Sequence, residues 1–193
     1  MVVEVVGGTL SGSLALIADA GHMLTDAASL ALAWGAARLT VHDEHGHRHG
    51  PHGQHRLQVV AAFVNSLALV VLVAWIAWEA VERLRDPQPI EGGTMLGVAL
   101  LGLAANVAVL YVLRSDDPEA NINVSAARLH VLGDLLGSVG ATIAALVIMD
   151  SGWTPIDPLL SLLVALLIAR SAWILLRRSS RLLYSNLGTD RVA

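Results

Sequence analysis

The sequence contains no cysteine and no lysine, and charged residues are scarce along its whole length. Without cysteine, neither a disulfide framework nor a thiolate metal site can form. Only 15% of the 193 residues are charged, whereas soluble globular domains have about a quarter. The net charge is −4 and every cation is an arginine, so we expect no nucleic-acid partner. With 55% hydrophobic residues, the chain is expected to lie in a lipid bilayer as an integral membrane protein.

Long apolar runs predict an all-α membrane helical bundle. A membrane-spanning helix needs about 20 apolar residues, and five stretches meet this length. The apolar stub from Met1 to Gly8 is too short to cross a membrane. We therefore expect one transmembrane domain over residues 1–182, with a His-rich loop at 42–56 and a short tail at 183–193. The five predicted spans are 13–39, 58–81, 93–113, 122–149 and 157–176.

Two of these spans carry ionisable residues that repeat one spacing. His22 and Asp26 lie in the first span, and His130 and Asp134 lie in the fourth. Residues four apart share one face of an α-helix. Ionisable side chains are costly in hydrocarbon, so their presence there indicates function. If the two helices pack face to face, they offer two imidazole nitrogens and two carboxylate oxygens, a set suited to tetrahedral Zn²⁺ and, after it, to Co²⁺.

A simpler interpretation of these residues is that they hydrogen bond between helices. Two pairs with matching spacing favour metal binding over this alternative. Asp19 lies about one turn before His22 on the same face. Asn65 and Asn106, which also lie inside predicted spans, are expected to be hydrogen-bond partners between helices. Small residues at Gly21, Gly133, Gly137 and Gly140 would allow close helix packing, although glycine is common in membrane helices.

The arginines predict the orientation of the bundle. Positive charge concentrates on the cytoplasmic side of membrane proteins. The loop after the first span and the C-terminal tail are rich in arginine, and the opposite side has only Arg83 and Arg85. The His-rich loop and the C-terminus are therefore predicted to be cytoplasmic. At 1.5 Å per residue, both His/Asp pairs then fall near the middle of the membrane.

Several motifs resemble those of the cation diffusion facilitator family, in its bacterial zinc-efflux branch. The run Gly8–Asp26 resembles the second membrane helix of that family, and Ala127–Asp134 resembles the fifth. Ala61–Asn65 is similar to part of the third helix, and Asp157–Pro158 to the start of the sixth. The resemblance covers nearly the whole chain. It implies that the five spans correspond to helices 2–6 of a six-helix transporter, in a truncated member without most of the first helix and without the C-terminal cytoplasmic domain.

The resemblance also implies a function. Members of this family move Zn²⁺ out of the cytosol across the cell (inner) membrane, usually in exchange for protons and usually as homodimers. The chain is then not an enzyme and has no cofactor, and Zn²⁺ is its transported substrate, with Co²⁺ or Cd²⁺ as further candidates. By motif match, His22, Asp26, His130 and Asp134 are the transport ligands. Asp19 matches the family pattern without being a ligand, so it is expected to support the site from outside the ligand set.

The His-rich loop is a candidate accessory metal site. Such tracts bind Zn²⁺ weakly and can gather metal near a transport pathway. The alternative is a solvated loop of variable length with no required ligand. The histidines concerned are His42, His45, His47, His49, His52 and His55.

Other functional classes remain as alternatives. A membrane-embedded zinc metalloenzyme could also use histidine and aspartate, but the sequence has no His-Glu-x-x-His motif. Catalytic zinc also keeps an open coordination position, whereas four protein ligands would close the site. An inactive fragment, a channel or a structural membrane subunit are the remaining possibilities.

Overall fold

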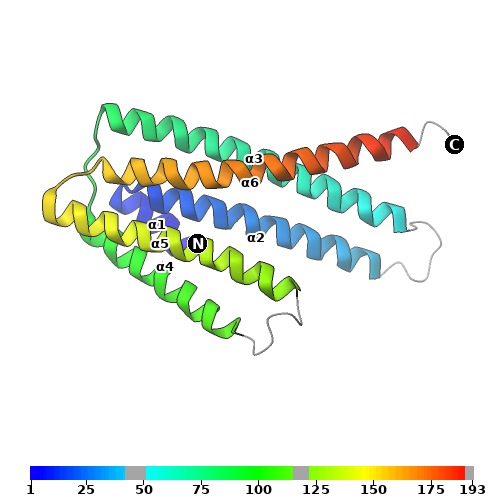
Figure 1. Cartoon of the computed structure of the whole chain (residues 1–193), viewed down its shortest axis with the longest axis horizontal. Helices are drawn as coiled ribbons and strands as arrows, with labels where there is room; N and C mark the ends of the chain where they lie inside the picture. The colour runs from blue at the N-terminus through cyan, green and yellow to red at the C-terminus, as the bar shows by residue number, and fades with distance from the viewer. Residues whose placement is uncertain (42–50, 115–121, 190–193) are drawn as a thin grey trace. The chain divides into compact units, whose positions relative to one another are not determined.

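The computed structural model describes residues 1–41, 51–114 and 122–189, and these residues are almost entirely helical. Six helices follow one another along the chain (Figure 1), and no strand occurs within these ranges. The all-α class predicted from the sequence is confirmed. The helices are α1 (Val2–Ser11), α2 (Leu14–Val41), α3 (Pro51–Arg85), α4 (Gly92–Val112), α5 (Ile122–Ser151) and α6 (Ile156–Thr189).

Four segments of the described helices are long and apolar enough to cross a membrane. They make the chain a multi-pass membrane protein. The predicted number of five is therefore wrong by one on this criterion. The missing segment is α2, whose apolar run is interrupted by the ionisable residues Asp19, His22 and Asp26. The four segments are Val59–Arg85, Gly92–Val112, Ala127–Ser151 and Ile156–Leu183.

Two helices extend beyond the boundaries that the sequence predicted. Helix α3 begins at Pro51, so residues 51–56 of the predicted loop are helical. Proline is well tolerated in a first helical turn, because the N–H that it lacks would have no partner within the helix there. Helix α6 continues to Thr189, although we predicted that its span ends near residue 176. Polar residues such as Arg177 and Ser180 limit the apolar span without ending the helix.

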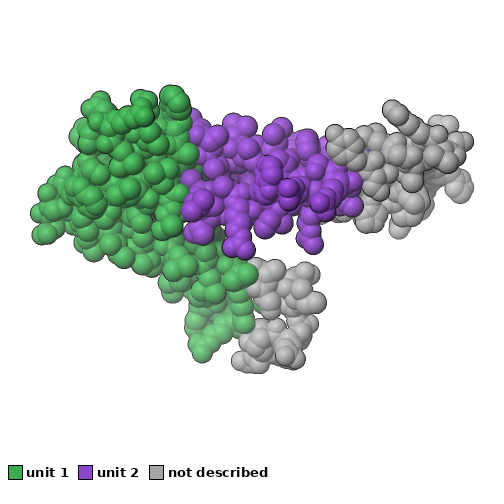
Figure 2. Space-filling model, turned by 45° about the horizontal axis from the view of Figure 1, so that its top comes forward, with its two compact units in different colours: residues 1–21, 76–164 green, residues 22–75, 165–193 purple. Residues whose placement is uncertain are grey.

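The chain divides into two compact units (Figure 2). The first unit comprises Met1–Gly21 and Ile76–Val164, and the second comprises His22–Trp75 and Ala165–Ala193. The first unit thus contains all of α1, α4 and α5, together with the first two turns of α2, the last turns of α3 and the first turns of α6. The boundary within α2 falls between Gly21 and His22.

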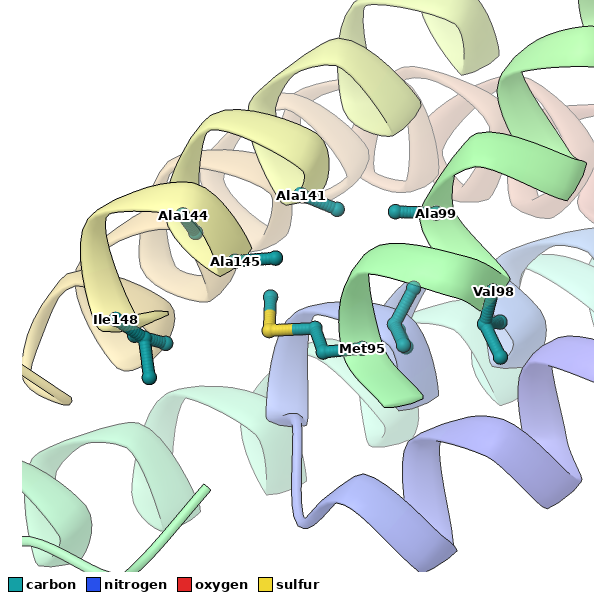
Figure 3. Close-up of a cluster of buried hydrophobic side chains, with 8 residues drawn as sticks. Met95, Val98, Ala99, Ala141, Ala144, Ala145 and Ile148 are labelled. Carbon is teal, nitrogen blue, oxygen red and sulfur yellow. The ribbon is translucent and has the colours of Figure 1, made fainter. Parts of the chain in front are cut away.

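The hydrophobic core of the first unit lies between α4 and α5. Figure 3 shows small side chains of α5 facing α4, with Met95 between the two helices. Met95 is completely buried, and so are Ala144 and Ala145. Leu16 from the start of α2 belongs to the same cluster. Alanines let the two backbones approach closely, and Leu16 connects α2 to this pair of helices.

Glycines allow close helix contacts in this unit, but mostly at positions that the sequence did not indicate. A Cβ on Gly7 would lie 2.2 Å from a methyl carbon of Val98, and one on Gly92 would lie 2.7 Å from Met149. By contrast, a Cβ on Gly133 would meet nothing within 4 Å. The expectation of close packing is therefore wrong for Gly133, but not for Gly137, where a Cβ would lie 3.6 Å from a side-chain oxygen on α2. Spacing along one helix does not reveal which face a neighbouring helix approaches.

We predict that Gly7→Ala destabilises the protein. The added methyl group would overlap Val98, and overpacking of this kind costs about 1–3 kcal/mol. The matched control is Gly97→Ala on α4, where the methyl group has open space and alanine favours the helix. Thermal unfolding of the detergent-solubilised protein should show a lower midpoint for Gly7→Ala only. Equal midpoints for the two variants would show that α1 does not pack tightly on α4.

Candidate metal-binding site

The start of α2 is fixed by a buried carboxylate from the other end of the chain. Asp157, in the first turn of α6, is fully buried. Its Oδ1 accepts a hydrogen bond of 2.6 Å from the Ser13 hydroxyl, and its Oδ2 accepts one of 2.7 Å from the Leu14 N–H. The Ala15 N–H also donates to Oδ1, at 3.3 Å. Asp157 thus satisfies N–H groups that the first turn of a helix leaves without a partner, and it places a negative charge at the positive end of α2.

The turn before α2 is held by further contacts within the same unit. Gly12 adopts a left-handed conformation, with φ of 75°, and ends α1. The guanidinium of Arg83 donates to the Gly12 carbonyl, and the Glu91 N–H donates to the Ser11 carbonyl at 2.9 Å. The point at which α2 begins is therefore set by α3, α4 and α6 together. This fixes how far along α2 each later residue lies from the bundle end.

His22 and Asp26 lie on one face of α2, as predicted. His22 Nε2 is 3.5 Å from Asp26 Oδ2, and both side chains are partly buried. Two ligands bound about 2.1 Å from a tetrahedral zinc ion are separated by about 3.4 Å. The two atoms are therefore spaced as two ligands of one ion would be. Both residues belong to the second unit.

His130 and Asp134 form the same arrangement on α5, in the first unit. His130 Nε2 is 3.6 Å from Asp134 Oδ2. Asp134 is the more buried of the two, with its side chain 12% exposed against 50% for His130. Each predicted pair is thus assembled on its own helix, with nearly equal separation of the nitrogen and the oxygen.

Asp19 belongs to the first unit and approaches α5. Its Oδ1 lies 3.6 Å from the position that a Cβ on Gly137 would occupy. Gly137 follows Asp134 by about one turn of α5. A Cβ at Gly137 would be in ordinary van der Waals contact with this oxygen, so the carboxylate of Asp19 lies against α5 at this turn.

The candidate accessory site cannot be placed in the same way. His42, His45, His47 and His49 lie outside the described residues. His52 and His55 belong to the first turns of α3, where the backbone is described and the side chains are not.

The sequence did not indicate a second group of buried polar residues in the first unit. Glu4 on α1 is only 7% exposed. Its Oε1 lies 3.0 Å from the position of a Cβ on Gly102, and its Oε2 lies 2.5 Å from the N-terminal amine of Met1. Nearby, Asn106 donates a 3.1 Å hydrogen bond to Ser138 on α5, which confirms the interhelical role expected for Asn106. In the sequence, Glu4 differs from its surroundings only as a single acid among valines. Apart from Met1, the residues that lie around it in the structure are far away along the chain, so the sequence could not indicate this group.

The comparison with known families decides which protein family this is. The family model for the cation efflux transmembrane domain matches residues 1–184. This chain belongs to the cation efflux family. The resemblance to the cation diffusion facilitators is thereby confirmed, and the family is one of transporters rather than enzymes.

Cation efflux relatives are similar over most of the chain. The zinc transporter ZitB of Escherichia coli (strain K12) is 56% identical over 184 residues, which cover 93% of this chain and 56% of the relative. The cadmium, cobalt and zinc/H⁺–K⁺ antiporter of Bacillus subtilis (strain 168) is 40% identical, covering 90% and 55%. The metal cation efflux system protein CzcD of Cupriavidus metallidurans is 37% identical, covering 98% and 59%. The chain therefore spans little more than half the length of these relatives.

We predict that Asp157→Ala destabilises the protein by about 2–4 kcal/mol. It removes a helix cap, worth about 1 kcal/mol, and leaves the buried Ser13 hydroxyl and Leu14 N–H without their acceptor, which costs about 1–3 kcal/mol. Asp157→Asn keeps one acceptor oxygen and should lose less. The control is Asp150→Ala at the exposed end of α5. If Asp157→Ala unfolds at the same temperature as this control, Asp157 does not fix the start of α2.

Proposed function

We propose that this protein transports a divalent metal cation, Zn²⁺ first of all, across the membrane through a site formed by His22, Asp26, His130 and Asp134. The observation that carries the proposal is the pair of matching His–Asp arrangements, with nitrogen and oxygen 3.5 and 3.6 Å apart. This separation suits two ligands of one tetrahedral ion. Joined at one ion, the pairs would supply two nitrogens and two oxygens.

The packing of the first unit supports a common site. Leu16 lies in a cluster with Ala141 and Ala145, and Asp19, further along α2, approaches Gly137. Over its first two turns, α2 thus runs along α5 in the opposite direction. If this register continues, the next turns of α2 carry His22 and Asp26 past the turns of α5 that carry Asp134 and His130. We infer from this register that the four ligands reach one level.

The relatives support the choice of substrate. ZitB is named as a zinc transporter, and the Bacillus protein as an antiporter of cadmium, cobalt and zinc with H⁺ and K⁺. Imidazole and carboxylate groups bind either a proton or a metal ion, so protons compete with Zn²⁺ at such a site. We propose that this competition couples metal efflux to proton entry. Zn²⁺ is then the transported substrate and not a cofactor, with Co²⁺ and Cd²⁺ as further substrates.

The proposed transport follows an alternating-access cycle. Metal loads from the cytoplasmic side, the bundle rearranges, and protons from the other side displace the metal. We further propose that the protein lies in the inner membrane, with the His-rich loop and the C-terminus in the cytoplasm, which is the orientation that the positive-inside rule predicts from the arginines. As a homodimer, which is usual in the family, each protomer would carry its own site. Asp19, beside Gly137, would support the site without binding the ion.

The metalloenzyme alternative is less well supported. Catalytic zinc keeps a coordination position open for water or substrate, whereas the four proposed ligands would fill a tetrahedral shell. The cation efflux family also consists of transporters.

We predict that Asp134→Asn weakens Zn²⁺ binding by at least the roughly 10–100-fold that loss of a partner outside the ligand set costs, because it removes one of the four charged or imidazole ligands. Proton-driven zinc uptake into everted vesicles should stop as well. The matched control is Asp150→Asn, which removes the same charge from the exposed end of the same helix. Zinc binding is measured by isothermal titration and uptake under an imposed pH gradient. If zinc uptake by the wild type does not change with the imposed pH gradient, proton coupling is refuted. If Asp134→Asn binds zinc as tightly as the wild type, the proposed site is refuted.

We predict that deleting residues 42–48 raises the zinc concentration needed for half-maximal transport without stopping transport. The deletion removes three loop histidines and so lowers the local supply of metal. A matched variant keeps the loop length and replaces His42, His45 and His47 by asparagine. Both variants should behave alike in the uptake assay. Complete loss of transport, or an effect of the deletion alone, would refute the accessory role of these histidines.

A further inference from the structure

The last described turns of α6 carry charge of only one sign. After Asp157, every charged residue up to Leu183 is an arginine. All of these arginines are exposed, and no carboxylate in the described ranges forms an ion pair with any of them. They are Arg170, Arg177, Arg178 and Arg181.

The length of the helix places Arg177 and Arg181 at the membrane surface, together with Arg178 on another face of the helix. The candidate membrane-spanning segment of α6 begins at Ile156 and continues to Leu183, with its apolar part ending before Arg177. At 1.5 Å per residue, Arg177 lies about 32 Å and Arg181 about 38 Å beyond Ile156 along the helix axis. The hydrocarbon core is about 30 Å thick, and the polar headgroups lie just outside it. Both side chains therefore reach the headgroup layer when Ile156 lies at the opposite boundary.

Arg177 is held in place by an aromatic ring one turn earlier. Its guanidinium carbon lies 5.3 Å from the centroid of the Trp173 ring. This contact uses the face of the planar guanidinium, so the N–H donors at its edge stay available for a phosphate. Trp173 is 55% exposed, and tryptophan is enriched at membrane interfaces. Arg181 lies one turn further along the same face of the helix, about 6 Å away along the axis.

We propose that the face of α6 formed by Trp173, Arg177 and Arg181 binds the phosphate of an anionic phospholipid. Two arginines about one helical turn apart, with no acidic neighbour paired to them, match a negatively charged headgroup in charge and reach. The apolar side chains Leu166 and Ile174, both exposed on α6, would lie along the acyl chains of the lipid. The proposal does not depend on metal transport, since none of its residues belongs to the proposed metal site.

The test compares lipid binding by purified full-length chains in native mass spectrometry. The probes are phosphatidylglycerol, which is anionic, and phosphatidylcholine, which is not. The wild type should bind phosphatidylglycerol more tightly. Arg177→Gln combined with Arg181→Gln should weaken this binding about 30-fold, the loss expected for two arginines at an anionic surface, and Trp173→Leu should weaken it about threefold.

The matched control combines Arg178→Gln with Arg85→Gln. It removes the same charge, from another face of α6 and from the end of α3, and should leave phosphatidylglycerol binding unchanged. An equal loss in this control would overturn the proposal in favour of general charge attraction. Equal affinity of the wild type for both lipids would also overturn it. The spectra report oligomeric state as well, so dissociation of a dimer in the Arg177/Arg181 variant without a change in lipid affinity would assign this face to a second copy of the chain.

Discussion

An ionisable side chain inside an apolar helix bundle needs a partner, and this requirement shapes the whole structure. Asp157 shows how it is met for structural purposes. Its buried carboxylate accepts hydrogen bonds from Ser13, Leu14 and Ala15, so the negative charge lies at the start of α2, where the helix dipole favours it. The same contacts fix the register of α2. The fixed start of α2 therefore sets how far along the helix each later polar residue lies.

The residues of the proposed site meet the same requirement in a different way. Each histidine lies beside an aspartate on its own helix, at a distance longer than a strong hydrogen bond and suited to a shared ion. A dication between four such groups would offset the cost of keeping two carboxylates in the membrane. When the ion leaves, protons can take its place. In the proposed function, coupling of transport to protons would follow from the chemistry of these ligands.

Much of the fold could be predicted from the sequence, because apolar runs and polar breaks give a strong signal in membrane proteins. The helices from α3 to α6 lie close to their predicted positions, and both His–Asp pairs share a helix face as their spacing required. The features that the sequence did not indicate depend on contacts between distant segments. The partners of Asp157 lie more than 140 residues away, and the packing of Gly7 on Val98 is set by α4. The number of apolar spans was overestimated because α2 was counted as one of them. Its apolar run is interrupted by the polar residues that belong to the candidate site.

The central claim is that one ion binds to two histidines and two aspartates. The most direct test is zinc K-edge X-ray absorption on the zinc-loaded protein, with the loop histidines His42, His45, His47, His49, His52 and His55 replaced by asparagine. We expect one zinc per chain, with four nitrogen or oxygen neighbours about 2.0–2.1 Å away and scattering from two imidazole rings. A six-coordinate shell, or a spectrum without imidazole scattering, would contradict the account.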